Sequence, residues 1–341
     1  MKWTSNKALR LPEVFTGPDR EFAASVIEGL SKPRKSLPCR YFYDARGSEL
    51  FEEITCLPEY YPARTEIAIL DAHAAEIANA APDGAVLVEF GSGSSRKTEI
   101  LLAHLPRLRA YVPIDVSESA LEEAKRRLIK RFPALDVRPL TGDFSGPVAV
   151  PQDLAKVPKL GFFPGSTIGN FPPFAASRLL GAMRRVLSPE GRLIVGVDLK
   201  KDARQLVRAY NDAAGVTAAF NLNLLARINR ELECSFDLDG FRHEAIYDPR
   251  EGRVEMHIVS LKNQAVRIRG LWFRFLAGET IHTENSYKYT IRQFQDLACS
   301  AGWMPGRVWT GGQNLFSVHE LMLGAPGSPA GHDRIQDGER C

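Results

Sequence analysis

The sequence predicts an α/β fold in which a parallel, doubly wound sheet is interrupted late in the chain by an inserted α+β segment. From about Thr65 to Asp198, short apolar runs bounded by glycine alternate with stretches of helical apolar spacing. Strands that alternate with helices are typical of a parallel sheet with helices on both faces. The alternation then stops, and it resumes near the end of the chain as one helix and two strand-like runs.

The elements expected in the first part of the sheet follow from apolar periodicity and turn residues. Helices are expected over 67–80, 97–105, 119–132 and 172–187, and strands over 85–90, 111–115, 160–163 and 192–198. Ser119 and Glu122 have the spacing of a capping box for the third of these helices.

The inserted segment has a different pattern. Residues 202–230 have helical spacing, whereas 243–286 contain alternating β patterns such as Arg253–Ser260. A helix over 291–301 and strands over 304–310 and 316–322 then complete the sheet. We therefore expect an insertion of about 90 residues between the fifth strand and a closing hairpin, with boundaries good to a few residues.

Composition indicates an ordinary globular protein with room for one large domain or two smaller ones. The chain has 341 residues, of which 44% are hydrophobic and 25% charged. A net charge of +3 argues against nucleic acid or a membrane surface as a partner. We find no apolar run of the length that spans a bilayer, and 1–14 lack the apolar core of a secretion signal.

Cysteine and histidine usage argues against disulfide or metal frameworks. The five cysteines are scattered without CxxC spacing, and the seven histidines form no HExxH pattern. Both observations fit a cytoplasmic protein without a metal. The tail 324–341, rich in glycine and proline, is expected to be disordered.

A glycine motif follows one of the predicted strands. The run Glu89-Phe-Gly-Ser-Gly-Ser-Ser95 places Gly91 and Gly93 where a backbone can approach a ligand closely at the carboxyl end of a strand. A dinucleotide fingerprint requires a third glycine, but that position is Arg96. S-adenosylmethionine (SAM) has no phosphate, and Glu89 can address its methionyl ammonium. The alternative is a turn that needs glycine only for its backbone conformation.

Two acidic residues lie where a nucleoside would be bound. Asp115 ends the next strand, 24 residues after Gly91, where a carboxylate can accept from ribose hydroxyls. Asp143 and Phe144 follow the strand after that, where they can offer a carboxylate to an adenine amino group and a ring to its face. Together with the glycine motif, they favour a SAM site.

Several long motifs resemble those of the histidine-specific N-α-methyltransferases of ergothioneine biosynthesis. These motifs are Tyr41-Phe-Tyr-Asp-Ala-Arg-Gly-Ser-Glu-Leu-Phe51, Leu57-Pro-Glu-Tyr-Tyr-Pro-Ala-Arg64, Val88-Glu-Phe-Gly-Ser-Gly-Ser94, Phe163-Pro-Gly-Ser-Thr-Ile-Gly-Asn170, Arg208-Ala-Tyr-Asn-Asp-Ala-Ala-Gly215 and Thr283-Glu-Asn-Ser286. The resemblance covers roughly residues 20–323. It implies three methyl transfers from SAM to histidine, which make hercynine (N-α-trimethylhistidine).

The resemblance also implies a domain organisation. A Rossmann-like methyltransferase sheet would carry an inserted α+β substrate-binding domain, with the active site between them. We assign 65–200 to the SAM-binding core, 288–323 to its closing helix and hairpin, and 1–64 with 201–287 to the substrate-binding domain. The tail 324–341 lies outside the resemblance.

The resemblance also implies which residues of this chain form the site, through their positions in the matching motifs. The resemblance implies that Asn170 holds the substrate amino and carboxylate groups, and that Tyr43 lies near the amine and SAM as the other catalytic residue. By itself, Asn170 could equally cap the helix expected from about Pro172. Tyr60 would line the histidine pocket and Tyr210 would bind the substrate carboxylate, although any single tyrosine is more often a partly buried ring.

The other carried-over residues concern the imidazole and the cofactor. Glu284 and Ser286 are two apart and share a face if the segment is a strand, so that they could grip both ring nitrogens. Met256 would pack on the ring, and Lys97 would complete the cofactor loop. Without the resemblance, each residue also has a purely structural explanation. Glu284 and Ser286 could lie on a solvated strand face, Met256 could fill the core, and Lys97 could be a solvated helix residue.

Other functions remain possible from the sequence alone. The chain could methylate another amino acid or small amine, bind SAM without catalysis, or be a nicotinamide oxidoreductase, although the missing third glycine argues against the last. We expect a monomer that uses no nucleic acid, membrane or metal. The expected chemistry is an in-line displacement in which the enzyme mainly aligns the amine and the sulfonium methyl.

Overall fold

The computed structural model describes residues 18–323, apart from residues 80, 94 and 147. The expectations for 1–14 and 324–341 lie outside the described residues. The chain divides into two compact units. Unit 1 comprises the chain up to Phe42 with 218–244 and 256–284, and unit 2 comprises 43–217, 245–255 and the chain from Asn285.

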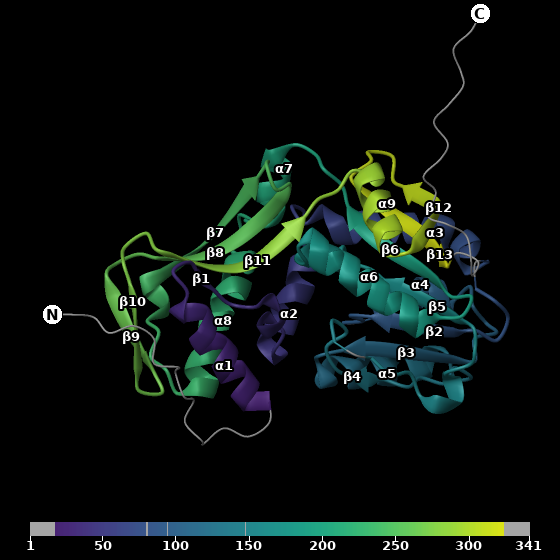
Figure 1. The fold of residues 1–341 in the computed structure, drawn as a ribbon, viewed down its shortest axis with the longest axis horizontal. Coiled ribbons are helices and arrows are strands. Elements are labelled where there is room, and N and C mark those ends of the chain that lie inside the picture. Colours follow the sequence, from purple (N-terminus) through teal and green to yellow (C-terminus); the bar gives the residue numbers. More distant parts are fainter. Residues whose placement is uncertain (1–17, 80, 94, 147, 324–341) are drawn as a thin grey trace, which may run out of the picture. The chain divides into compact units, whose positions relative to one another are not determined.

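Unit 2 is built on a seven-stranded sheet with the order β12-β13-β6-β5-β2-β3-β4 (Figure 1). Its strands are β2 (Val86–Phe90), β3 (Ala110–Asp115), β4 (Leu140–Thr141), β5 (Lys159–Phe163), β6 (Arg192–Asp198), β12 (Trp303–Thr310) and β13 (Phe316–Leu323). β2 to β6 pair in parallel, whereas β13 pairs antiparallel with both β6 and β12. This confirms the predicted parallel sheet closed by a hairpin.

Helices cover both faces of this sheet because strand residues alternate between the two faces. The helices are α2 (Ala45–Thr55), α3 (Tyr61–Ala78), α4 (Arg96–Leu102), α5 (Glu118–Arg131), α6 (Pro173–Leu187), α7 (Ala203–Ala209) and α9 (Ile291–Ser300), with 3-10 turns η2 (Gln152–Leu154) and η3 (Thr167–Asn170). α6 and α9 pack on the face that carries Val86 and Val88. α3, α4 and α5 pack on the face that carries Leu87 and Phe162.

Unit 1 contains α1 (Pro18–Ser31), the 3-10 turn η1 (Cys39–Phe42), most of α8 (Val216–Leu232) and η4 (Leu238–Gly240). It also contains the hairpin of β9 (Gln264–Ile268) and β10 (Leu271–Phe275). A four-stranded sheet has the order β1-β11-β8-β7, made by β1 (Lys35–Ser36), β11 (Thr280–Tyr287), β8 (Arg253–Ser260) and β7 (Phe241–Asp248). The last three strands contribute residues to both units.

Asn221 attaches α8 to the strands of unit 1. Its buried side-chain amide donates to the carbonyl oxygen of His257 at 3.0 Å and pairs with Nδ1 of His243 at 2.8 Å. Its Oδ1 accepts from the hydroxyl of Thr283 at 2.8 Å. One polar side chain therefore hydrogen-bonds to three strands, β7, β8 and β11.

The predicted helices and strands of the sheet agree with the structure to within three residues, except at the start of α3. α3 begins at Tyr61, six residues before the predicted start, with Pro62 in its first turn. The predicted capping box is wrong: the N-cap of α5 is Ser117, whose extended backbone lets its hydroxyl accept from the amide of Ala120. Ser119 already lies inside the first turn, where its backbone is helical.

Gly196 of β6 gives a test of the packing between the sheet and α3. A Cβ at this position would lie 2.0 Å from Oε1 of the buried Glu66. We expect Gly196→Ala to destabilise the protein by about 1–3 kcal/mol, the usual range for overpacking, as measured by denaturant unfolding. Gly181→Ala is the control, because the nearest atom is 4.0 Å away and alanine is favoured inside a helix such as α6. Equal losses in the two variants would contradict the prediction.

Candidate active site

The strand order of unit 2 reverses at the carboxyl ends of β2 and β5. The chain runs from β2 outward to β3 and β4, and then returns to β5 and β6 on the other side of β2. Ligands of doubly wound sheets bind where the order reverses in this way. The glycine motif follows β2 and the loop that ends at Asn170 follows β5, so both predicted motifs lie at this position.

The glycine loop has the backbone conformation that the sequence predicts. Gly91 and Gly93 have φ angles of +74° and +48°, which side chains rarely allow. A Cβ on Gly91 would lie 3.0 Å from the ring of Phe144, so the ring packs directly on the loop backbone. Asp115 holds the loop, since its Oδ2 accepts from the amide of Gly93 at 2.8 Å. Its Oδ1 accepts from the amide of Ser117 at 3.0 Å.

Glu89 is buried beneath this loop, and only one of its two carboxylate oxygens has hydrogen-bond partners among the described residues. Its Oε2 accepts from the hydroxyls of Thr98, at 2.7 Å, and Tyr111. Among the described residues nothing bonds to its Oε1, or to the buried hydroxyl of Ser92 in the same loop. Burial raises the pKa of Glu89 to about 8, although the hydrogen bonds and the charge of Lys97 oppose the shift. Two unsatisfied polar atoms at one loop indicate a place where a polar ligand binds.

Asp143 and Phe144 lie on the loop after β4. Asp143 accepts from the amide and hydroxyl of Ser145 at 2.8 and 2.6 Å, a local turn that orients the carboxylate. The half-buried ring of Phe144 contacts Phe163 and Phe171 edge-on, with centroids 5.5 and 6.4 Å apart. An aromatic ring held next to the glycine loop can stack on one face of a planar ligand.

Lys97 has a structural partner that the sequence did not suggest. Its ammonium lies 2.6 Å from Oε2 of Glu66, which is almost fully buried. The same carboxylate accepts from the amide of Gly165, at 3.0 and 2.9 Å to its two oxygens. Lys97 therefore neutralises a carboxylate that holds the loop after β5, and its contact with a cofactor stays a prediction.

Asn170 is the last residue of η3. α6 is capped by Pro172 without a side-chain hydrogen bond, so the alternative reading of Asn170 as the cap of this helix is wrong. The preceding Gly169 allows close packing, since a Cβ there would lie 2.8 Å from the carbonyl oxygen of Tyr287. The loop after β5 thus lies against the end of β11, next to Ser286.

Four aromatic rings of unit 2 form a continuous row. Tyr43 contacts Phe51, Phe51 contacts Tyr60, and Tyr60 contacts Tyr210, with centroids 5.7, 6.3 and 6.0 Å apart. All three contacts are edge-on, a favourable geometry for aromatic pairs. The structure therefore brings together the three tyrosines that the sequence singled out.

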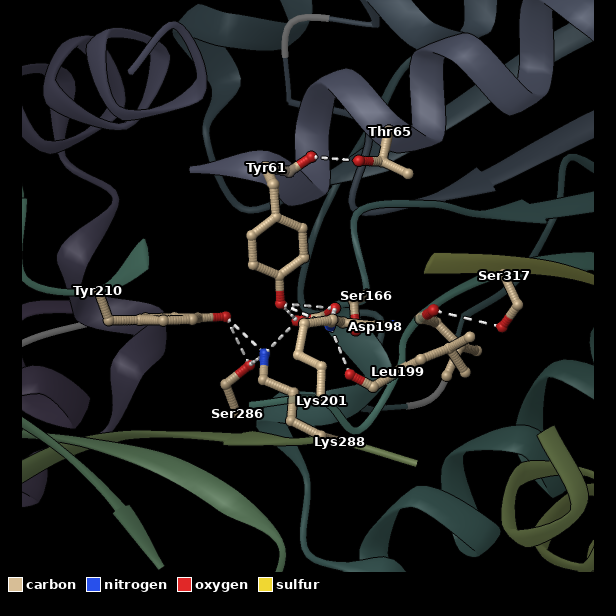
Figure 2. A network of polar contacts seen from close by, with 11 residues as sticks. Tyr61, Thr65, Ser166, Asp198, Leu199, Lys201, Tyr210, Ser286, Lys288 and Ser317 are labelled. Atoms are coloured by element: carbon tan, nitrogen blue, oxygen red, sulfur yellow. Dashed lines mark hydrogen bonds and ion pairs between the residues drawn. The ribbon is translucent and has the colours of Figure 1, made fainter. Parts of the chain in front are cut away.

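A buried polar network surrounds Asp198 at the carboxyl end of β6 (Figure 2). The ammonium groups of Lys201 and Lys288 lie 2.5 and 2.6 Å from its two oxygens. The hydroxyl of Tyr61 donates to the same carboxylate at 2.7–2.8 Å and accepts from Lys201 at 2.7 Å. The amide of Asp198 donates to the hydroxyl of Ser166 at 2.9 Å.

Lys288 connects this network to two predicted substrate residues. Its ammonium donates to the hydroxyls of Tyr210, at 2.9 Å, and Ser286, at 2.8 Å. These two hydroxyls are 2.7 Å apart and hydrogen-bonded to each other. Figure 2 shows both hydroxyls turned toward the ammonium of Lys288. Tyr210 and Ser286, separated by 76 positions in the sequence, thus act as one hydrogen-bonded pair.

The charges of the network are strongly coupled. Burial disfavours the ionised form of Asp198, but the charges of Lys288 and Lys201 outweigh it and hold the pKa of Asp198 below its usual value. Burial lowers the pKa of Lys201 to about 8, because Asp198 offsets only part of the lost hydration. Burial and then Asp198 raise the pKa of Tyr61, so Tyr61 remains a hydrogen-bond donor.

Glu284 and Met256 belong to unit 1, where both are buried, with 9% and 2% of their surface exposed. Glu284 lies on β11 two residues before Ser286, as the strand prediction requires. The pKa of Cys39 is raised to about 12, first by burial and then by the charge of Glu284. Glu284 therefore has a mostly buried carboxylate, and its contact with a substrate stays a prediction.

The sequence analysis missed Tyr61, Asp198, Lys201 and Lys288. One pattern could have identified Lys288: Glu284, Ser286 and Lys288 alternate along β11 and the residue after it, so all three share a face. The remaining three come from α3 and from β6 and the segment after it. No local pattern distinguishes them from ordinary helix and strand ends.

Two further features of the described residues bear on function. A pocket of about 380 Å³ in unit 2 is lined by Pro58, Glu59, Tyr61, Arg64, Gln205 and Arg208, and it contains none of the predicted site residues. The described part of the chain contains no cluster of three or more potential metal ligands and no helix long and apolar enough to cross a membrane.

Comparisons with known proteins bear directly on the function. Residues 22–323 match the family model described as "Histidine-specific methyltransferase, SAM-dependent". The chain is 43% identical to histidine N-alpha-methyltransferases of Mycobacterium tuberculosis (strain CDC 1551 / Oshkosh) and Mycolicibacterium smegmatis, over 84% of this chain and 89% of each relative. It is 31% identical to ergothioneine biosynthesis protein 1 of Neurospora crassa, over 86% of this chain and 34% of that protein.

Asp198 provides a test of the network. Asp198→Asn leaves the ammonium groups of Lys201 and Lys288 buried without their counter-charge, so we expect a loss of about 3–5 kcal/mol in the free energy of unfolding, measured with denaturant at pH 7. Asp153→Asn is the control, because Asp153 makes an exposed ion pair with Arg138, and exposed pairs contribute little. A loss at Asp198 no larger than at Asp153 would show that the network does not depend on this charge.

Proposed function

The chain belongs to the histidine-specific, SAM-dependent methyltransferase family, and from this premise we propose that it converts L-histidine to hercynine by three successive N-α-methylations. The observation that carries the proposal is the family match, which spans 22–323 and so includes nearly all of the described chain. The 43% identity to two histidine N-alpha-methyltransferases supports the same substrate, and we propose a place in ergothioneine biosynthesis.

The glycine loop of unit 2 fits SAM. Oε1 of Glu89 and the hydroxyl of Ser92 lack partners among the described residues, and a methionyl ammonium and carboxylate can supply partners to a buried acceptor and a donor. Asp115 would accept from the ribose hydroxyls, while Asp143 and Phe144 would hold the adenine. Gly91 and Gly93 would admit the ligand to the loop backbone, and Lys97 would add positive charge beside it.

We propose that this chain's residues mainly position the amine. SAM supplies an activated methyl group on a sulfonium, and transfer needs an amine lone pair in line with the carbon–sulfur bond at about 3 Å. Asn170 would hold the substrate amino and carboxylate groups, because an amide both donates and accepts. Tyr43 would face the amine, and its hydroxyl with water could relay the proton that leaves before each attack.

The substrate side chain is proposed to be recognised by both of its ring nitrogens. Glu284 would accept the imidazole N–H, and Ser286 would serve the other nitrogen. Tyr60 and Met256 would enclose the ring, while Tyr210 would bind the substrate carboxylate. A buried carboxylate left without a partner is costly, so an apolar side chain in place of imidazole would be rejected.

The direct test is an assay of the purified protein with SAM and each of the amino acids in turn, read by mass spectrometry. We expect trimethylhistidine from histidine and no product from tyrosine or tryptophan. A trimethylated product from another amino acid, with none from histidine, would overturn the substrate assignment. SAM binding without turnover of any amine would overturn the enzymatic one.

We also propose that the enzyme is a monomer in the cytoplasm and uses no nucleic acid. The small net charge of +3 supports the last point. Sedimentation of the purified protein at several concentrations tests the first, and a dimer at micromolar concentration would contradict it.

Glu284→Ala tests the recognition of the imidazole. It removes the acceptor proposed for the ring N–H, so we expect kcat/KM for histidine to fall by roughly a hundredfold, while the Kd for SAM changes less than threefold. The exposed Glu251 of the same sheet region provides the control variant Glu251→Ala. Equal effects on histidine and SAM would show that Glu284 supports the fold and not the selection of substrate.

Because the pKa of Glu89 is raised, we expect SAM binding to release a proton. Its pKa of about 8 means that Glu89 is mostly protonated at pH 6.5, and a bound ammonium would favour the carboxylate and lower this pKa. Calorimetry of SAM binding at pH 6.5, in buffers of different ionisation enthalpy, should report release of nearly one proton. Glu89→Gln should abolish the release. Wild-type binding without proton release would contradict the placement of the ammonium at Glu89.

A further inference from the structure

Tyr111 of β3 joins the two ends of the glycine loop through its hydroxyl group. The residue is fully buried, and its ring belongs to the apolar cluster beneath α3, α4 and α5. The hydroxyl donates to Oε2 of Glu89, at the start of the loop, and is hydrogen-bonded to the hydroxyl of Ser95, at its end, at 2.9 Å. A hydroxyl buried among apolar side chains is unfavourable without partners, and these two bonds supply them.

The register of the sheet brings this hydroxyl to Glu89. β2 and β3 pair in parallel, with Tyr111 opposite Leu87 and Pro113 opposite Glu89. Glu89 therefore lies on the same face as Leu87 and Tyr111, two residues nearer the carboxyl end of the sheet. The ring of Tyr111 spans this step, so its hydroxyl lies at the base of the glycine loop.

Both hydroxyl donors to Glu89 act on the same oxygen. Oε2 accepts from Tyr111 and from Thr98, the latter at 2.7 Å, and Oε1 has no partner among the described residues. Two donors on one oxygen fix the rotation of the carboxylate and leave the other oxygen for a ligand. Burial, and then the charge of Glu89, raise the pKa of Tyr111, so its hydroxyl keeps the proton that it donates.

Ser95 has a left-handed backbone conformation, with φ +54° and ψ +18°, which is uncommon outside glycine. It is the N-cap residue of α4, but its side chain makes no capping hydrogen bond. Its hydroxyl bonds to Tyr111, and its amide donates to the carbonyl oxygen of Ser92 at 2.8 Å. A strained conformation persists only where its surroundings hold it, and Tyr111 provides the side-chain bond that does so here.

We propose that Tyr111 is a positioning residue for the cofactor, whose hydroxyl fixes the carboxylate of Glu89 and the end of the glycine loop in the arrangement that binds SAM. The proposal rests on the function proposed above, in which SAM binds at this loop. Tyr111 acts through Glu89 and Ser95, since none of its own surface is exposed.

Tyr111→Phe tests the proposal because it removes the hydroxyl and keeps the ring. We expect the Kd for SAM, measured by calorimetry at pH 7.0, to rise at least about fivefold, as for the loss of a hydrogen bond to a charged group. Once SAM is saturating, kcat and the KM for histidine should change less than about threefold, because Tyr111 has no contact with the substrate in this proposal.

Tyr289→Phe is the matched control. Tyr289 is also a buried tyrosine of unit 2, but its hydroxyl has no hydrogen-bond partner among the described residues, so we expect its removal to change the Kd for SAM less than about twofold. A smaller rise than fivefold in Tyr111→Phe, an equal rise in Tyr289→Phe, or a loss confined to kcat would overturn the proposal.

Ser95→Ala tests the second bond of the Tyr111 hydroxyl. We expect it to raise the Kd for SAM about threefold, and the double variant with Tyr111→Phe to bind no more than about twofold more weakly than Tyr111→Phe alone, because both changes remove the same bond. Effects that simply multiply would overturn the link between Tyr111 and the end of the loop. If Tyr111→Phe does not fold, Ser95→Ala decides, and an unchanged Kd then overturns the proposal.

Failure of this inference is distinguishable from failure of the proposed function. If the wild type neither binds SAM nor methylates histidine, the proposed function is wrong. If the wild type does both and Tyr111→Phe binds SAM equally well, only the role of Tyr111 is wrong.

Discussion

The arrangement of the candidate site in unit 2 depends on the burial of one carboxylate, that of Asp198. A buried carboxylate must be compensated by cations and hydrogen bonds, since its lost hydration is worth several kcal/mol. The compensation comes from Tyr61 at the start of α3, from Lys201 after β6 and from Lys288 after β11. Each of these groups is held in position, because moving it would leave the buried carboxylate of Asp198 without one of its partners. Tyr210 and Ser286 are positioned in turn, through Lys288.

The polar groups around Asp198 and those beneath the glycine loop differ in how completely they are hydrogen-bonded within the chain. Around Asp198, every proton of the two ammonium groups has an acceptor within the chain. Beneath the glycine loop, by contrast, Oε1 of Glu89 and the hydroxyl of Ser92 have none among the described residues. The first set of groups is therefore formed before substrate arrives, whereas the second is completed by its ligand. This difference supports the proposal that SAM binds at the glycine loop, because a bound ligand would supply the missing partners.

Sequence patterns account for most of the fold and for part of the site. Apolar runs predict the parallel strands because a strand buried on both faces needs apolar residues throughout, as in the wholly buried β2. Gly91 and Gly93 are predictable because few other residues adopt a positive φ. Helix starts are less predictable, because a cap depends on which serine has the extended backbone, Ser117 or Ser119, and both are compatible with the local sequence.

By itself, the sequence determined the order of strands and helices, the glycine loop and the set of motifs that resemble one enzyme family. Each of these depends on residues that are close together in the chain. The tertiary structure alone decided that Tyr61 and Lys201 meet on Asp198, and that Lys288 connects this charge to Tyr210 and Ser286. Tyr61 and Asp198 are 137 positions apart, and Tyr210 and Lys288 are 78 apart. Such contacts follow from strand order and from the need to neutralise a buried charge, neither of which leaves a periodic pattern in the sequence.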